Sequence, residues 1–180
     1  MKIIAIDVGN SETTIGVGNS QGWQGYRFTT RKTVTSDELL MMFKTIIDDP
    51  LIKEGLIEGA IICSVVPEIT NSVSEATSRF ISKDVLIVGP GVKTGLKVNI
   101  DNPKELGPDR IANSIGGYSK VSSEVIVVDL GTATTFDIVN TKKEYLGGSI
   151  APGIKISLDA LTSKTSSLKS VELETPKNVV

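Results

Sequence analysis

The 180-residue sequence contains no histidine and only one cysteine, Cys63. Without histidine, Ser-His-Asp hydrolysis and histidine-based zinc sites are excluded. A general base at neutral pH must then be Asp or Glu, with Lys, Tyr or Cys as remoter options. A single cysteine cannot form an internal disulfide, which fits a reducing cytoplasm. Because Cys63 lies inside the apolar run AIICSVV and has no histidine to activate it, we expect a buried strand residue and not a nucleophile.

Long apolar runs and excess charge are also missing. No apolar run approaches the ~20 residues needed to span a bilayer. The formal net charge of -2 gives no support to nucleic-acid or membrane binding. The opening MKIIAIDVGN has no small-residue cleavage site, so we expect a first strand and not a signal peptide. With 39% hydrophobic and 22% charged residues, the chain is ordinary globular material for one large domain or two small ones.

The sequence repeats one hairpin-like segment after 122 positions. Residues 126–139, IVVDLGTATTFDIV, align without a gap on residues 4–17, IAIDVGNSETTIGV. Each copy has an apolar β-branched run, an Asp-x-Gly turn with small polar residues, and a second β-branched run, which predicts a strand, a tight turn and a returning strand. The matching pairs are Ile4/Ile126, Asp7/Asp129, Gly9/Gly131, Thr13/Thr135 and Val17/Val139.

The two turns have the composition of an anion site. Glycine allows backbone angles that other residues avoid and lets another group come close, so the turn N–H groups can donate to an anion. The Asp at the strand end would repel a bare phosphate, which makes sense mainly if a cation lies between them. Two such hairpins facing each other predict a clamp for a nucleotide polyphosphate and its metal. Either copy alone could be only a turn, and the repetition in register favours the clamp. The polar neighbours are Asn10, Ser11, Thr13, Thr132 and Thr134.

The first half predicts an α/β domain with a mixed sheet. Residues 2–30 read as an antiparallel meander of three short strands. Residues 35–49 predict a helix with a Thr35/Glu38 capping box, ending before Pro50. The segments 57–67 and 84–90 read as buried strands, separated by a helix at 70–82. This is the order of a ribonuclease H-like domain, whose sheet packs helices on both faces.

The segment 92–106 is polar and turn-rich, so we expect a surface loop that could touch a ligand. GPDR then begins a helix with Pro108 in its first turn, where the missing N–H costs nothing. Asp109 lies in the same turn, where the helix dipole favours a carboxylate. Arg110 offers a planar fork for a carboxylate or phosphate. The alternative for this pair is an ordinary helix start with a solvated charge pair.

After the second hairpin we expect a strand at 144–153 and a helix from about Gly153 to Ser163, whereas 165–180 shows no period. The predicted domains are therefore 1–118 and 124–180. By analogy with the first copy, the second domain is incomplete and its missing strands would leave apolar edges exposed.

A repeated ribonuclease H-like unit with an Asp-x-Gly hairpin in each half resembles the superfamily of acetate kinase, sugar kinases, Hsp70 chaperones and actin. Within it, three motifs together resemble the type III pantothenate kinases. Their co-occurrence in this order, over essentially the whole chain, is specific. They are DVGNS at 7–11, GPDR at 107–110 and DLGTATTFD at 129–137, supported by GGSIAPG at 147–153.

This resemblance implies transfer of the γ-phosphoryl group of ATP to the primary hydroxyl of pantothenate, the first step of coenzyme A synthesis. It further implies Mg²⁺, a monovalent cation (K⁺ or NH₄⁺) and a homodimer. Asp109 falls on the proposed proton acceptor and Asp129 on the monovalent-cation ligand. ATP-binding positions are Asp7, Val8, Gly9, Asn10, Ser11, Glu12, Thr13, Thr14 and Thr132, and pantothenate-binding positions are Ile100, Gly107, Pro108, Asp109 and Arg110.

Two departures from the family pattern leave alternatives open. Ile100 stands where family members commonly carry a tyrosine, so recognition of the substrate tail differs. Family members also continue past position 180, which suggests a fragment or a natural truncation. The runner-up is a non-catalytic regulator of the Bvg accessory factor type, or an inactive fragment that still binds ATP. Another sugar or acetate kinase is disfavoured by GPDR standing directly before the second hairpin.

Overall fold

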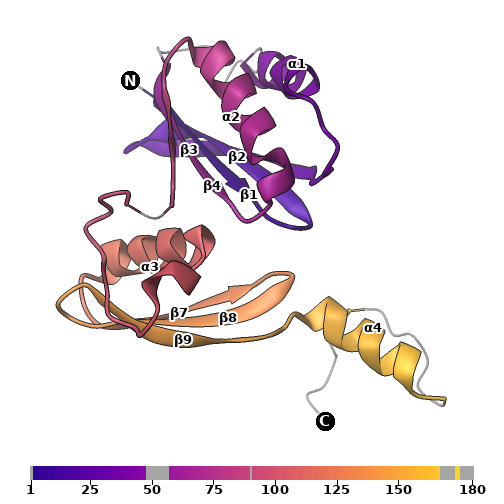
Figure 1. Cartoon of the computed structure of the whole chain (residues 1–180), viewed down its shortest axis with the longest axis vertical. Helices are drawn as coiled ribbons and strands as arrows, with labels where there is room; N and C mark the ends of the chain where they lie inside the picture. Colours follow the sequence, from indigo (N-terminus) through magenta and orange to yellow (C-terminus); the bar gives the residue numbers. More distant parts are fainter. Residues whose placement is uncertain (1, 48–56, 90, 167–172, 175–180) are drawn as a thin grey trace.

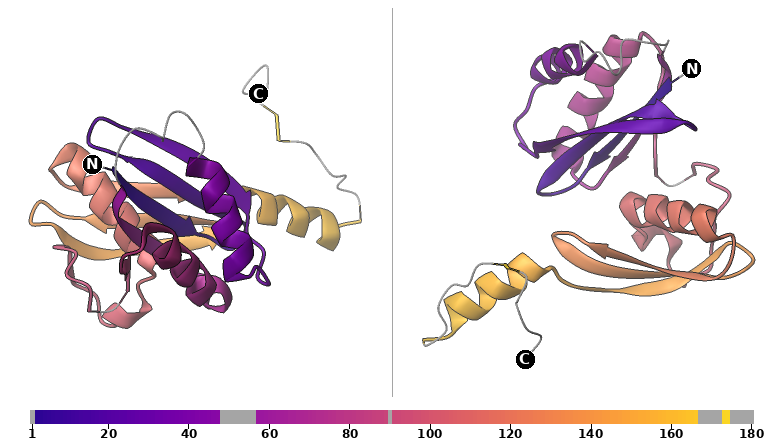
Figure 2. Two further views of the ribbon diagram at one scale, coloured as in Figure 1. Left: turned by 90° about the horizontal axis from the view of Figure 1, so that it is seen from above. Right: turned by 180° about the vertical axis from the view of Figure 1, so that it is seen from behind.

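The computed structural model describes residues 2–47, 57–89, 91–166 and 173–174. Two mixed β-sheets lie one above the other, with helix α3 (Pro108–Val121) between them (Figure 1). Helix α4 (Ile154–Lys164) projects from the end of the second sheet, as the two views of Figure 2 show. The expected duplication of a mixed-sheet α/β unit is therefore visible in the architecture. None of the described helices is long and apolar enough to cross a membrane.

The first sheet has the strand order β3-β2-β1-β4-β5. Its first three strands form the predicted antiparallel meander, and the last two run parallel to β1. The order of strands and helices predicted for a ribonuclease H-like unit is confirmed here. The strands are β1 (Lys2–Val8), β2 (Glu12–Asn19), β3 (Gly22–Thr29), β4 (Ile57–Ser64) and β5 (Val85–Ile87).

Two helices, α1 (Ser36–Ile47) and α2 (Pro67–Ile81), pack on one face of this sheet. The capping box at the start of α1 is confirmed, because the Thr35 N–H donates to Glu38 Oε2 (2.9 Å) and the Glu38 N–H donates to Thr35 Oγ1 (3.3 Å). Helix α2 begins three residues earlier than predicted. Pro67 can lie in the first turn, because the N–H that proline lacks has no partner within the helix there.

The segment 84–90 does contain a strand, but the expectation that this strand is buried is wrong. Strand β5 has only three residues and lies at the edge of the sheet. Leu86 and Ile87 are 49% and 37% exposed. An apolar run cannot by itself distinguish an edge strand from a central one.

The second sheet has the strand order β6-β9-β8-β7. Strands β7, β8 and β9 form a second antiparallel meander, and the short β6 pairs parallel with β9. The predicted hairpin, strand and final helix are all confirmed. The segment 165–180, for which no periodic structure was expected, lies largely outside the described residues. The elements are β6 (Lys97–Val98), the 3₁₀-helix η1 (Pro103–Glu105), β7 (Val125–Leu130), β8 (Ala133–Val139) and β9 (Glu144–Pro152).

The segment 92–106 is more than the surface loop predicted. It contributes β6 to the second sheet, and Leu96 and Leu106 are buried in a small core with Val139 and Tyr145. Two leucines among polar and turn residues were too sparse to reveal a periodic pattern. The segment thus belongs to the packing of the second sheet, although it precedes the boundary expected near residue 118.

The gapless alignment of the two hairpins is corrected by their registers. Asp7 lies opposite Thr14 in the first hairpin, whereas Asp129 lies opposite Thr135 in the second. The second turn is therefore one residue shorter, and Thr135 is the counterpart of Thr14, not of Thr13. A one-residue shift exchanges the two faces of a strand, so β8 presents its side chains differently from what the sequence alignment implied.

Candidate active site

The first hairpin turn is braced by Thr30, which follows β3. Within the turn, the Gly9 N–H donates to the Glu12 carbonyl (3.0 Å). The Thr30 hydroxyl donates to the Gly9 carbonyl (2.7 Å), and the Thr30 N–H donates to the Ser11 carbonyl (2.9 Å). Sequence analysis missed Thr30, because nothing in its local pattern sets it apart from any residue at a strand end. These bonds fix the turn in one conformation.

The side chain of Thr13 turns inward from this hairpin. It is 8% exposed and its hydroxyl lies 2.9 Å from that of Thr30. Ser11, by contrast, is exposed at the turn. Of the hydroxyls predicted at the first turn, the one on Ser11 is therefore placed to meet a ligand directly.

The second hairpin turn is closed by Gly131 and capped by Gly153. The Gly131 N–H donates to the Ala133 carbonyl, and the Gly153 N–H donates to the Thr132 carbonyl, each over 3.0 Å. A Cβ atom on Gly153 would collide with the carbonyl groups of Gly131 and Thr132. Glycine at this position therefore lets the start of α4 lie directly against the turn.

The two turns meet across the gap between the sheets. Ser11 Oγ and Thr132 Oγ1 lie 2.8 Å apart, although 121 positions separate the residues. The predicted face-to-face arrangement of the hairpins is thus observed. Each turn therefore brings one hydroxyl to the same place, where both hydroxyls can donate to one anionic group.

Asp7 lies at the end of β1, beside Cys63 of β4. Desolvation raises the pKa of the Asp7 carboxyl, and the negative charges of Asp109 and Asp129 raise it further, against a hydrogen bond from the Cys63 thiol. Asp109 of α3 and Asp129 of β7 are therefore close enough for their charges to act on Asp7 of β1. They form a negatively charged centre beside the two turns.

Cys63 is 8% exposed, as expected for a strand residue. Burial raises the pKa of its thiol to about 12, and the neighbouring negative charges of Asp7 and Asp109 act in the same direction. The thiol is consequently protonated at neutral pH. Its role is to donate a hydrogen bond to Asp7, and the prediction that it is not a nucleophile is supported.

Asp109 lies in the first turn of α3, at the place predicted from GPDR. Pro108 occupies a first-turn position and Gly107 is the N-cap residue. The Arg110 N–H donates to Asp109 Oδ1 over 2.8 Å. A Cβ on Gly107 would lie 2.5 Å from the same oxygen, so glycine leaves room for the carboxylate. Because α3 contacts β4 of the first sheet and β7 and β8 of the second, it holds Asp109 between the two halves.

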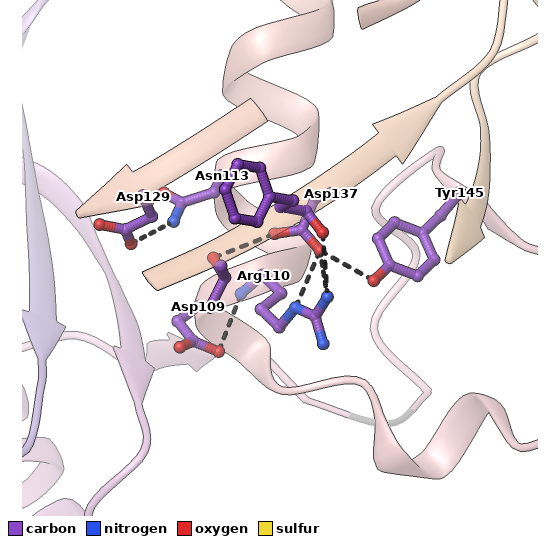
Figure 3. A network of polar contacts seen from close by, with 8 residues as sticks. Asp109, Arg110, Asn113, Asp129, Asp137 and Tyr145 are labelled. Carbon is purple, nitrogen blue, oxygen red and sulfur yellow. Dashed lines mark hydrogen bonds and ion pairs between the residues drawn. The ribbon is translucent and has the colours of Figure 1, made fainter. Parts of the chain in front are cut away.

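Asp129 is held by a side chain that sequence analysis did not identify. Asn113 of α3 donates from Nδ2 to Asp129 Oδ2 over 2.9 Å (Figure 3). Asn113 lies one helical turn after Arg110, so its spacing from GPDR places it on the same side of the helix. That spacing was the signal available in the sequence.

Arg110 does not form the solvated charge pair with Asp109 that was the alternative reading. Its side chain is 13% exposed and its guanidinium pairs with Asp137 of β8, with Nε and Nη2 each 2.8 Å from Asp137 Oδ1 (Figure 3). Nη2 also approaches the Phe136 carbonyl at 3.4 Å. Much of the planar fork predicted to meet a ligand is thus occupied by the protein itself.

Ile100 is half-buried and packs against the core of the second sheet. It lies beside Gly147 of β9, whose φ of 125° is in the region that favours glycine. The hydrogen bonds and distances of the described residues do not connect Ile100 to Asp109. Its predicted contact with a substrate stays a prediction.

The aspartates near the two turns could supply some, but not all, of the ligands of a hard cation such as Mg²⁺. Among the described residues, no group of three or more Asp, Glu, Cys or His side chains is arranged to hold a metal ion. Mg²⁺ is typically bound through one or two carboxylates together with water and substrate phosphates. Asp7 and Asp129, next to the turns, have the donor chemistry for such a shared site.

The sequence of this chain is similar to those of known proteins. The sequence model described as type III pantothenate kinase matches residues 3–180. Curated relatives described as type III pantothenate kinase include proteins from Exiguobacterium sp. (38% identical), Syntrophotalea carbinolica (40%) and Halalkalibacterium halodurans (41%). Each match spans 179 residues, which is 99% of this chain and 70% of the relative.

The solved structures that match this chain are more distant in sequence. A Ppx/GppA phosphatase from Aquifex aeolicus matches with a TM-score of 0.49 and 15% identity, over 93% of this chain and 56% of that chain. A ROK family glucokinase from Streptomyces griseus matches with a TM-score of 0.47 and 13% identity, over 84% of this chain and 48% of that chain. The family model, in contrast, matches nearly the whole sequence, and the chain belongs to the type III pantothenate kinase family.

Proposed function

We propose that this chain transfers the γ-phosphoryl group of ATP to the primary hydroxyl of pantothenate, giving 4′-phosphopantothenate, the first step of coenzyme A biosynthesis. The observation that carries the proposal is the position of Asp109, in the first turn of a helix that contacts both sheets, close to two turns that meet at Ser11 and Thr132. Family membership supports the choice of substrates.

The two turns would position the polyphosphate. Backbone N–H groups in the segment from Asp7 to Thr14, with the hydroxyls of Ser11 and Thr132, would donate to phosphate oxygens from opposite sides. Phosphoryl transfer depends mainly on positioning and on stabilising charge. Turns fixed by internal hydrogen bonds, such as those from Thr30 and Gly153, meet that requirement because they need little reorganisation.

Asp109 would accept the proton of the substrate hydroxyl. In phosphoryl transfer the hydroxyl proton leaves late, so an ordinary carboxylate can accept it. Gly107 and Pro108 bring the chain into the helix beside the acceptor, and the Arg110 N–H holds one carboxylate oxygen. The second carboxylate oxygen is then available to the hydroxyl.

We also propose that Asp7 and Asp129 hold the cations that accompany ATP. A bound Mg²⁺ would neutralise phosphate charge, and a monovalent cation, K⁺ or NH₄⁺, would do so at Asp129. The raised pKa of Asp7 supports this assignment, since a nearby cation would offset the unfavourable negative charge. The proposal extends to a homodimer, which rests on the family resemblance. It extends also to the cytoplasm, where a single unpaired cysteine fits the reducing environment.

The test is ATP-dependent phosphorylation of pantothenate by the wild-type chain and by Asp109→Asn. We expect the substitution to lower kcat at least about 100-fold, because the proton acceptor is lost. ATP affinity, measured by calorimetry, should stay within about threefold, because the turns are intact. Glu105→Gln is the matched control, since Glu105 lies just before GPDR and accepts a hydrogen bond only from Asn102 among the described residues.

The same assay separates the alternatives. A wild-type chain that binds ATP but does not turn over would favour the non-catalytic regulator or an inactive chain, and would contradict the proposed reaction. Equal loss of turnover and of ATP binding in Asp109→Asn would contradict the role given to Asp109. Replacing K⁺ by Na⁺, with Asp129→Asn as the matched variant, tests the cation role: activation by K⁺ that survives the substitution unchanged would contradict it.

A further inference from the structure

A buried polar cluster surrounds the guanidinium group of Arg110. We call it the Arg110 socket, and it consists of Asp137, Tyr145 and the backbone of Phe136 and Gly148. The Asp137 side chain is fully buried. Its Oδ1 accepts hydrogen bonds from Arg110 Nε and from the Tyr145 hydroxyl, each over 2.8 Å. Buried carboxylates are stable only when they are paired and hydrogen-bonded in this way.

The backbone of β9 is shaped to admit the guanidinium. The register shifts between Ile138, which faces Gly147, and Val139, which faces Tyr145, so Leu146 is an extra residue that forms a bulge in β9 next to Gly147. A Cβ on Gly148 would lie 2.5 Å from Arg110 Nη2 and would collide with the Phe136 carbonyl. Glycine therefore leaves the space that the guanidinium fills.

The carboxylate in the socket is specific to the second copy of the repeat. In the observed registers Thr135 corresponds to Thr14, so Asp137 corresponds to Gly16. The first hairpin has the same turn chemistry without a buried charge at this position. Asp137 is therefore not required by the hairpin, and its role must be sought in what it contacts.

That contact leads directly to Asp109. The Arg110 side chain is anchored in the second sheet, while its backbone N–H donates to Asp109 Oδ1 over 2.8 Å. Arg110 Nη1 has no hydrogen bond among the described residues, and Figure 3 shows this end of the group directed away from Asp137. Arg110 thus contacts the buried carboxylate on β8 through its side chain and the carboxylate at the start of α3 through its backbone.

We propose that Asp137 and Tyr145 are positioning residues, which act through Arg110 to fix the first turn of α3 and thereby the direction of the Asp109 carboxylate. Only the kinetic part of this inference rests on the proposed function. Tyr145 is 1% exposed and its ring lies 5.9 Å from Arg110 Cζ, so it holds the guanidinium both through Asp137 and by direct contact.

The first test is independent of catalysis. In ¹⁵N NMR spectra of the wild-type chain, the Arg110 Nε–H should exchange slowly with solvent, and the backbone amide of Arg110 should be protected. In Asp137→Asn we expect the Nε–H to exchange at least about 10-fold faster and the Arg110 amide resonance to move. An unchanged amide, with the Nε–H bond lost, would overturn the link from the socket to Asp109.

The second test is kinetic. We expect Asp137→Asn to lower kcat about 30- to 100-fold, because a small displacement of a catalytic group has an effect of this size, with the KM for ATP within about twofold. Glu144→Gln is the matched control: Glu144 precedes Tyr145 in β9, and its side chain contacts the exposed Lys97 and Asn140 and no member of the Arg110 socket, so kcat should stay within about twofold. A kcat per folded molecule that is unchanged in Asp137→Asn would overturn the proposal.

Tyr145→Phe covers the case in which Asp137→Asn does not fold. It removes one hydroxyl from the same carboxylate and keeps the ring, so we expect kcat to fall about 3- to 10-fold. An unchanged kcat, with the Arg110 amide unmoved, would overturn the proposal. An inactive wild-type chain would instead contradict the proposed function, and the NMR comparison would still decide the positioning role.

Discussion

The two sheets begin with the same meander but bury opposite faces of it. In the first sheet, Ile4, Ile6 and Val8 of β1 are at most 2% exposed beneath α1 and α2. Their counterparts in β7 are Ile126, Val128 and Leu130, which are 62%, 49% and 67% exposed. The apolar pattern is shared, so the difference comes from the elements that pack on each sheet.

The returning strands show the same contrast. Ile15 and Val17 of β2 are buried, whereas their counterparts in the observed register, Phe136 and Ile138, are 39% and 41% exposed. Helix α3 packs instead on the other face of the second sheet, where Gly117 lies against Val127. The second copy therefore uses the face that carries Asp129, Thr135 and Asp137 as its covered side.

What the copies keep in common is the polar end of the hairpin. Each has an aspartate at the end of the first strand, a threonine opposite it and a glycine in the turn. The comparison teaches that the residues of each turn are fixed by the local sequence, whereas the face that each sheet buries depends on helices distant in sequence. The proposed ligand site uses the two turns, which are the duplicated part.

The largest expected difference between the sheets is in stability. Ile6→Ala should lower the free energy of unfolding by about 2–5 kcal/mol, because it leaves a cavity in a packed core. Val128→Ala, at the corresponding position, should cost under about 1 kcal/mol, since the side chain is half exposed. Urea denaturation of both variants measures this. Equal costs would show that the face of the second sheet is covered in solution and would remove the contrast.

Asp7 and Asp129 should also differ in their effect on the free energy of unfolding. Because the pKa of Asp7 is raised in the folded chain, its charge destabilises the fold above that pKa and has no effect once the group is protonated in both states. Asp7→Asn should therefore raise the free energy of unfolding at pH 7, by under about 1 kcal/mol after solvent screening. The gain should vanish as the pH falls below about 4.

Asp129→Asn is the matched variant, and it should not stabilise the chain, because Asn113 already donates to the Asp129 carboxylate. Unfolding measured from pH 3 to pH 8 follows both variants. Destabilisation by Asp7→Asn at pH 7 would contradict the account of the negatively charged centre.

The smallest expected effect concerns the contact between the turns. Ser11→Ala and Thr132→Val each remove one hydroxyl of an exposed hydrogen bond. A double-mutant cycle on the free energy of unfolding should give a coupling below about 1 kcal/mol. A larger coupling would mean that the bond itself holds the two sheets together, and that α3 matters less than we infer.

Much of the fold followed from the sequence because its signals were local. The Thr35/Glu38 box, Pro108 and the alternation in the two hairpins mark the ends of elements through contacts within a few residues. The exposure of β5, the small core around Leu96 and the hairpin registers depend on partners far along the chain. No local pattern contains that information.

The candidate site divides in the same way. Asp7, Asp109 and Asp129 were predicted from motifs, and the structure brings them together. The residues that support the site were missed: Thr30 holds the first turn, Asn113 holds Asp129, and Asp137 holds Arg110, all through side-chain contacts that only folding creates. Arg110 was singled out correctly, but its main partner is a buried carboxylate of the same chain.

The most direct test of the account asks whether both turns bind the same nucleotide. Hydrogen exchange of the backbone amides should be compared with and without ATP and Mg²⁺, using the turn at 19–22 as the internal control. The account predicts slower exchange at both 9–12 and 131–133, with the control unchanged. Protection of only one turn, or of neither at saturating ATP, would contradict the claim that the two copies form one site.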